Sequence, residues 1–77
     1  MRIFQVTDLN GKTHTRRGRE YSYGVAVVTA DKAMFVATGL GAPKDEDATH
    51  PYAQHVLRKM RAKGIPAEIR ITTEVTL

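Results

Sequence analysis

The residues of this chain that are most able to do chemistry are its lysines and arginines. Eight of the twelve fall in two groups: Lys12, Arg16, Arg17 and Arg19, then Arg58, Lys59, Arg61 and Lys63. Cations grouped on a loop and on the exposed side of a helix are the usual electrostatic footprint for phosphate backbones. The pattern therefore favours nucleic-acid binding, although an ordinary solvated helix face is also often basic.

Proteins that bind single strands usually combine such cations with exposed aromatic side chains, on which the bases stack. Tyr21 and Tyr23 are the candidates here, because Phe4 and Phe35 occupy strand positions that we expect to be buried. The sequence carries no RRM, KH, zinc-finger or helix-turn-helix signature. Any binding of nucleic acid would therefore lack a recognisable means of reading base sequence.

Side chains suited to catalysis are sparse. Ser22 lies inside a strand-like stretch, without the strand-turn-helix context that exposes a nucleophile, and we expect it to be a small packing residue. His14, His50 and His55 lie in three different settings, and His50 and His55 are not at the i, i+4 spacing of two metal ligands on one helix face. A metal-free ribonuclease could use His14 or His55 beside a neighbouring cation as acid and base, but surface histidines are common.

The acidic segment around Asp45, Asp47 and Thr49 has the spacing that opens a calcium loop. It lacks the glycine and the glutamate that such a loop needs further on, since His50 and Val56 stand at those positions. Cysteine is absent, which excludes a disulfide or a thiolate metal site. We therefore expect a non-enzymatic protein with no catalytic residue, no bound metal and no cofactor.

The stretch from Tyr21 to Leu40 predicts the β-hairpin around which the other elements are arranged. A two-residue turn at Asp31-Lys32 would place Val28 opposite Phe35, and side chains would alternate between two faces. One face would carry Tyr23, Val25, Val27, Thr29, Met34, Val36, Thr38 and Leu40, and the other Ser22, Gly24, Ala26, Val28, Phe35, Ala37 and Gly39. Neither face is polar, so both need to be covered.

The rest of the chain predicts a strand over residues 2–9, one helix over residues 51–63 and a last strand over residues 67–77. Asn10-Gly11 is a strong hairpin signal, after which residues 12–17 form either a second strand or a loop. The helix begins at Pro51, ends at Gly64 and carries one apolar stripe. That stripe is Ala53, Val56, Leu57 and Met60, and the inward residues of the last strand are Ile69, Ile71, Thr73, Val75 and Leu77.

These elements predict a single α+β domain spanning residues 1–77. One helix would pack on a small, mostly antiparallel sheet of about four strands, in the order β-β-β-α-β. A single helix covers only one face of such a sheet, so the hairpin would keep an open apolar face for a homodimer or a partner protein.

The predicted interface is Tyr23, Val25, Val27, Met34, Val36 and Leu40. If the helix covers this face, Val28 and Phe35 are left open instead. A third possibility is that residues 12–20 or 41–49 fold back over the open face.

Charge and composition leave two function classes. The chain has 77 residues, a net charge of +4 and a pI near 9.8, which favours polyanionic partners. It holds no apolar run long enough for a signal peptide or a membrane span, so we expect a cytoplasmic protein without membrane contact.

The first function class is a basic, homodimeric module that binds nucleic acid. The alternative is an accessory or inhibitor protein that occludes a partner's surface, for which a phage or mobile-element origin fits the size. Steep salt dependence would indicate the first class.

Overall fold

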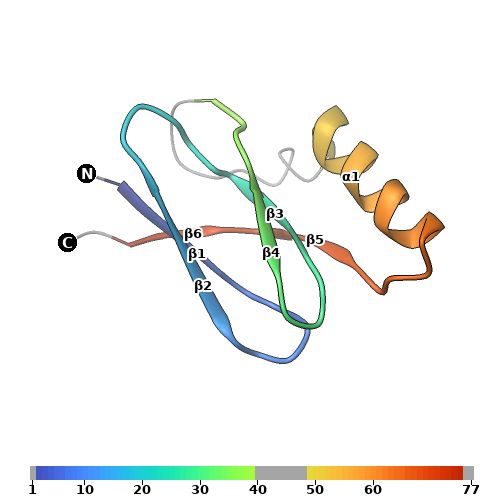
Figure 1. Ribbon diagram of the computed structural model, residues 1–77. Helices are drawn as coiled ribbons and strands as arrows, with labels where there is room; N and C mark the ends of the chain where they lie inside the picture. Colours follow the sequence, from blue (N-terminus) through green and yellow to red (C-terminus); the bar gives the residue numbers. More distant parts are fainter. Residues whose placement is uncertain (1, 40–48, 76–77) are drawn as a thin grey trace.

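The computed structural model describes residues 2–39 and 49–75. Its elements are β1 (Arg2–Thr7), β2 (Thr13–Gly18), β3 (Val25–Val28), β4 (Ala33–Val36), α1 (Pro51–Ala62), β5 (Glu68–Ile71) and β6 (Thr73–Val75) (Figure 1). The predicted α+β class is confirmed, with roughly the predicted order of strands and helix. Residues 12–17, which the sequence left open between strand and loop, belong almost entirely to β2.

The strands form two antiparallel three-stranded sheets, in the orders β2-β1-β6 and β4-β3-β5. The prediction of a single sheet of about four strands is therefore wrong. β5 pairs with β3 and β6 pairs with β1, so one nearly continuous stretch of chain supplies an edge strand to each sheet. Figure 1 shows this stretch passing from the β4-β3-β5 sheet to the β2-β1-β6 sheet.

The change of sheet takes place at Thr72. Its backbone N–H donates to the carbonyl of Gly24 at 2.9 Å, and its hydroxyl donates to the carbonyl of Tyr23. Thr72 is buried, whereas Ile71 is 41% exposed and Thr73 is also exposed, so the predicted inward positions of Ile71 and Thr73 are wrong. The simple alternation fails because the strand turns from one sheet to the other at this residue. Leu77 lies outside the described residues.

The central hairpin has the predicted faces but a different register. Val25 lies opposite Val36 and Val27 opposite Met34, because the two turn residues are Ala30 and Asp31 rather than Asp31 and Lys32. Around this turn, the Thr29 N–H donates to the carbonyl of Lys32 at 2.9 Å. Moving the turn by one residue shifts the pairing by two, and side chains alternate with a period of two. Each side chain of the paired strands β3 and β4 therefore stays on its predicted face. Tyr23, which precedes β3, does not: its ring packs against Phe4 and Phe35 on the side that faces β1.

Both faces of this hairpin are covered within the chain. α1 packs on the face that carries Val25, Val27 and Val36, while Val6 of β1 packs on Ala26 and Val28 of the other face. The molecule thus has three layers: α1, the β4-β3-β5 sheet and the β2-β1-β6 sheet. The expected open face does not exist, because the N-terminal strands form a covering sheet instead of extending the central one.

α1 begins at Pro51 as predicted and ends at Ala62, one residue before the predicted end. The imidazole Nδ1 of His50 accepts from the Tyr52 N–H at 3.3 Å, and Pro51 occupies the first turn, where its missing N–H costs nothing. Lys63 is the C-terminal cap, and Gly64 follows with a φ of 77°. Ala53 and Leu57 are buried against the central sheet, with Val56 and Met60 partly buried beside them. The predicted apolar stripe is therefore the packed side of α1.

Leu57→Ala should lower the free energy of unfolding by roughly 2–5 kcal/mol, because it opens a cavity between α1 and the central sheet. Urea melts of the two proteins measure the difference. Lys59→Ala, a neighbouring exposed position, should change the free energy by no more than about 0.5 kcal/mol. A change below about 1 kcal/mol for Leu57→Ala would contradict the assignment of the packed face.

Candidate nucleic-acid interface

The first basic group lies on β2 and at its two ends. β2 pairs with β1 from Thr7 opposite Thr13 to Arg2 opposite Gly18, and its other edge pairs with no strand in residues 2–39 and 49–75. Arg16 and Arg17 are on the strand, Lys12 precedes it, and Arg19 follows it; all four side chains are exposed. We call these four residues the β2 cluster. An outer edge strand is thus lined with cations.

The turn that leads into β2 is held by the carboxylate of Asp8, which is 1% exposed. This group accepts from the backbone N–H groups of Asn10 at 2.9 Å and Lys12 at 3.0 Å, and it lies 2.8 Å from Nε2 of His14. The hydrogen bond from His14, together with the two backbone N–H groups, lowers the pKa of Asp8, against the opposing effect of burial. Asp8 therefore fixes the hairpin on which the β2 cluster stands.

Arg16 is stacked on an aromatic ring. Its guanidinium carbon lies 4.9 Å from the centre of the Tyr23 ring. Tyr23 in turn meets Phe4 and Phe35 edge to face, at 6.0 and 6.3 Å between ring centres. A cation over a ring face is attracted by the ring quadrupole, so Arg16 is held in place while it stays exposed.

Gly18 lets the chain turn back tightly after β2. A Cβ atom at this position would lie 2.4 Å from the carbonyl oxygen of Tyr21 and 2.8 Å from the Phe4 ring. Glycine is therefore required at position 18 for a steric reason, because no larger residue leaves room for this approach. The turn brings Arg19 and Tyr21 next to the end of β2, and Tyr21 is 56% exposed.

Within residues 2–39 and 49–75, no ion pair joins the β2 cluster to a carboxylate. The ion pairs among the described residues join Arg2 to Glu74, His14 to Asp8 and Arg70 to Glu68, and none of them includes a residue of the β2 cluster. The positive charge of the β2 cluster is therefore not paired with a described carboxylate, and it is available to a bound anion.

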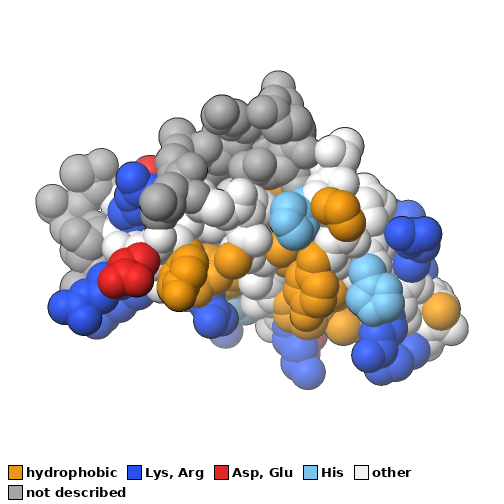
Figure 2. Space-filling model, turned by 90° about the horizontal axis from the view of Figure 1, so that it is seen from above, with side chains coloured by type: hydrophobic (Ala, Val, Ile, Leu, Met, Phe, Trp, Pro, Cys, Tyr) orange, Lys and Arg blue, Asp and Glu red, His pale blue; other side chains and the backbone are white. Residues whose placement is uncertain are grey.

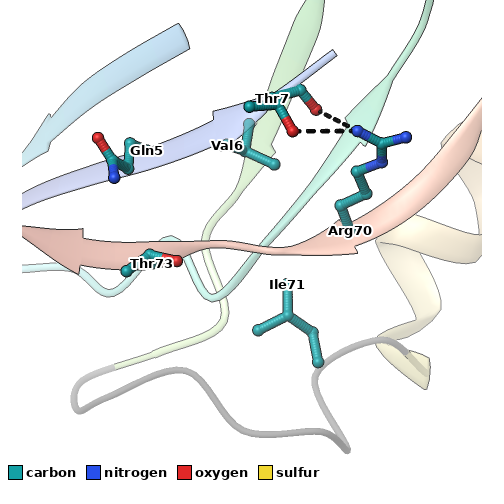
Figure 3. Close-up of a pocket in the computed structure, with 6 residues that line it drawn as sticks. All are labelled: Gln5, Val6, Thr7, Arg70, Ile71 and Thr73. Atoms are coloured by element: carbon teal, nitrogen blue, oxygen red, sulfur yellow. Dashed lines mark hydrogen bonds between the residues drawn. The ribbon is translucent and has the colours of Figure 1, made fainter. Parts of the chain in front are cut away.

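Arg70 is used in the opposite way, as a residue that supports the fold, and this role was not predicted. Its Nη1 donates to the carbonyl of Thr7 at 3.0 Å, to the Thr7 hydroxyl at 3.1 Å and to the carbonyl of Asp8 at 3.0 Å (Figure 3). Its Nε donates to Glu68 at 2.5 Å. Arg70 thus joins the two sheets beside a hollow of about 170 Å³. Its guanidinium is hydrogen-bonded within the protein and supports the fold. The alternation of Glu68 and Arg70 along β5 was the only available signal.

The second basic group is on α1 and at its C-terminal end. Arg58, Lys59, Arg61 and Lys63 are all exposed, and Arg61 also donates to the carbonyl of Ala67 at 3.3 Å. We call these four residues the α1 cluster. Because α1 and the β2-β1-β6 sheet cover opposite faces of the central sheet, the two clusters stand on different outer layers. Figure 2 shows Lys and Arg side chains at both ends of this face and along its lower margin, beside hydrophobic side chains and two histidines.

The residues predicted to form an apolar interface are largely internal. Val25, Val27 and Val36 are buried beneath α1, while Tyr23 and Met34 are half-buried. Val25, Val27, Val36 and Met34 therefore belong to the core that α1 covers, whereas Tyr23 packs against Phe4 and Phe35 on the other side of the hairpin. Leu40 lies outside the described residues.

The structure gives the candidate catalytic side chains ordinary surroundings. Ser22 is buried, and its backbone N–H donates to the carbonyl of Gly39 at 2.6 Å. His14 pairs with Asp8, His50 caps α1, and His55 is exposed near Tyr52. Within residues 2–39 and 49–75, no three His, Asp or Glu side chains are grouped as a metal site would require. The candidate calcium segment at Asp45 and Asp47 lies outside the described residues.

No protein-family model, curated protein sequence or solved structure matches this chain. In the part of the chain that the structure describes, the one helix is too short and too polar to cross a membrane. What the protein does must therefore be inferred from its own residues.

Asp8→Asn should lower stability at neutral pH, because the amide cannot replace a carboxylate that accepts three hydrogen bonds. The fold favours the ionised form, so the contribution of Asp8 is complete above its ordinary pKa of 3.8 and is lost as pH falls through its lower folded value. Urea midpoints measured between neutral and acidic pH should differ most at neutral pH and converge in acid.

Asp31→Asn, in the exposed turn of the central hairpin, is the matched control for the loss of one negative charge. A constant gap between Asp8→Asn and the unmodified protein down to the lowest pH would contradict a depressed pKa for Asp8.

Proposed function

We propose that this protein is a small non-enzymatic module that binds nucleic acid without base-sequence readout, chiefly through the β2 cluster. The observation that carries the proposal is that these four exposed cations line an outer edge strand and have no carboxylate partner among the described residues. Uncompensated cations on a rigid support gain most from contact with phosphates, because they displace the counterions that surround a nucleic acid.

The dimensions of β2 support the same proposal. From Lys12 to Gly18 the extended chain covers about 20 Å, at about 3.3 Å per residue. That length matches the rise of about six nucleotides along one strand of a duplex, at about 3.4 Å each. Arg16 and Arg17 are neighbours on the strand, so they point to opposite faces and can contact a backbone that follows the edge. The α1 cluster is a second contact for a longer strand that bends around the molecule.

The second candidate function is binding of a partner protein, and one hollow favours it. Met34 of β4, Met60 of α1 and Ile65 line a space of about 360 Å³ with Lys32 and Lys63. The outer edge of β4 pairs with no other described strand. An extended apolar segment flanked by carboxylates fits this position, since it could add to the β4 edge and place a side chain against the methionines. Binding of that kind would persist at high salt.

Reversing Arg16, Arg17 and Arg19 to Glu should weaken binding to a fluorescein-labelled oligonucleotide about ten-fold or more at low salt. The slope of log affinity against log salt should also become shallower by about two, because three phosphate contacts are lost at about 0.7 each for a single strand. Fluorescence anisotropy across a salt series measures both quantities.

The matched control is reversal of Arg58, Lys59 and Arg61 to Glu, which makes the same charge change on α1. We expect it to have the smaller effect, since it leaves the β2 cluster intact. Absence of binding by the unmodified protein at low salt would refute the proposed function. Equal effects of the two triple variants would refute the leading role of the β2 cluster.

We propose that the single chain is the binding unit. The homodimer expected from the sequence depended on an open hairpin face, and both faces are covered within the chain. Light scattering after size exclusion, at micromolar concentration, should give a mass near 8.6 kDa. Twice that mass would indicate that two copies pair through a strand edge such as β2 or β4.

A further inference from the structure

We infer that the ligand class is single-stranded nucleic acid and that a base stacks on Tyr21; this inference rests on the proposed function. Tyr21 is two residues beyond Arg19, and its backbone carbonyl lies against Gly18 at the end of β2, so Tyr21 stands on the segment that carries the last cation of the β2 cluster. Among the described residues, no aromatic ring or cation is stacked on the 56% exposed side chain of Tyr21. The ring is therefore accessible to a base.

The backbone that carries Tyr21 is fixed on both sides. The adjacent Ser22 is 2% exposed, donates its N–H to the carbonyl of Gly39 at 2.6 Å and accepts at its own carbonyl from the Thr38 N–H at 2.9 Å. The carbonyl of Tyr21 lies close over Gly18. A ring on so constrained a segment loses little backbone freedom on binding, which is the advantage of a preorganised contact.

Tyr23 cannot serve in the same way. Arg16 lies over its ring, and Phe4 and Phe35 pack against it edge to face. Of the two tyrosines beside the β2 cluster, only Tyr21 has room for a base. The stack of Arg16 on Tyr23 instead fixes a cation near the path that a bound strand would follow.

This geometry favours a single strand over a duplex. The bases of a duplex are stacked on one another, whereas unpaired bases can turn a face to an aromatic side chain. Every base has such a face, so a contact of this kind needs no particular sequence. The β2 cluster would give affinity for both forms, and Tyr21 would give the preference for the unpaired one.

The experiment compares an oligothymidylate of about twelve nucleotides with a mixed-sequence duplex of the same length, by fluorescence anisotropy at low salt. Tyr21→Ala should weaken binding of the single strand about five-fold or more, the range measured for loss of one stacked base. Its affinity for the duplex should change less than about two-fold. Tyr21→Phe should keep the affinity for the single strand, because it keeps the ring.

Tyr52→Ala is the matched control, since Tyr52 is 59% exposed but lies on α1, in another layer. It should leave both affinities within about two-fold. An abasic oligonucleotide tests the same contact with the unmodified protein, independently of how any variant folds. It should bind about five-fold or more weakly than the oligothymidylate.

Equal binding of the abasic oligonucleotide and the oligothymidylate would overturn the inference. So would an equal loss for single strand and duplex in Tyr21→Ala. In either case, a salt-dependent loss in the Arg16, Arg17 and Arg19 reversal would still support the proposed function. If the unmodified protein binds neither oligonucleotide, the proposed function and the inference both fail.

Discussion

The structure depends on the burial of β3 on both of its faces. All four of its residues, Val25 to Val28, are fully buried, and they alternate between the side under α1 and the side under β1. A strand of this kind is stable only between two apolar layers. In a chain of 77 residues those layers must come from one helix and from the two terminal stretches of strand. The three-layer arrangement follows from that requirement.

The same requirement decides where charge can lie. β2 is the strand farthest from β6 in its sheet, and its outer edge makes no strand pair among residues 2–39 and 49–75, so its cations are in water. Arg70, by contrast, lies where β5 and β1 separate, and there it satisfies the carbonyls of Thr7 and Asp8. Residues of the same type thus take different roles according to position. Arg70 supports the fold, and the β2 cluster faces outward.

Much of this could be predicted from the sequence, for reasons that are local. Pro51 and Gly64 mark the ends of α1, and the faces of the hairpin follow from alternation alone. The bend at Thr72 could not be predicted, because Ile69, Ile71, Thr73 and Val75 alternate as they would in a straight strand, and its hydrogen-bond acceptors belong to Tyr23 and Gly24. The stack of Arg16 on Tyr23 could not be predicted either, because it depends on both the β1–β2 register and the close turn at Gly18. The residues of the β2 cluster could be predicted, but the contacts that hold Arg16 in place could not.

The shared stretch of β5 and β6 also has a consequence for synthesis of the chain. Ile3 pairs with Val75, so β1 leaves the ribosome well before β6, the strand that completes its sheet. Contacts between residues so far apart in sequence slow folding, because a long loop must close before they form. Until then β1, which carries the buried residues Phe4 and Val6, is paired with β2 alone, and its other edge has no strand partner. We therefore expect the nascent chain to become protected against proteases in a single late step, once β6 has emerged.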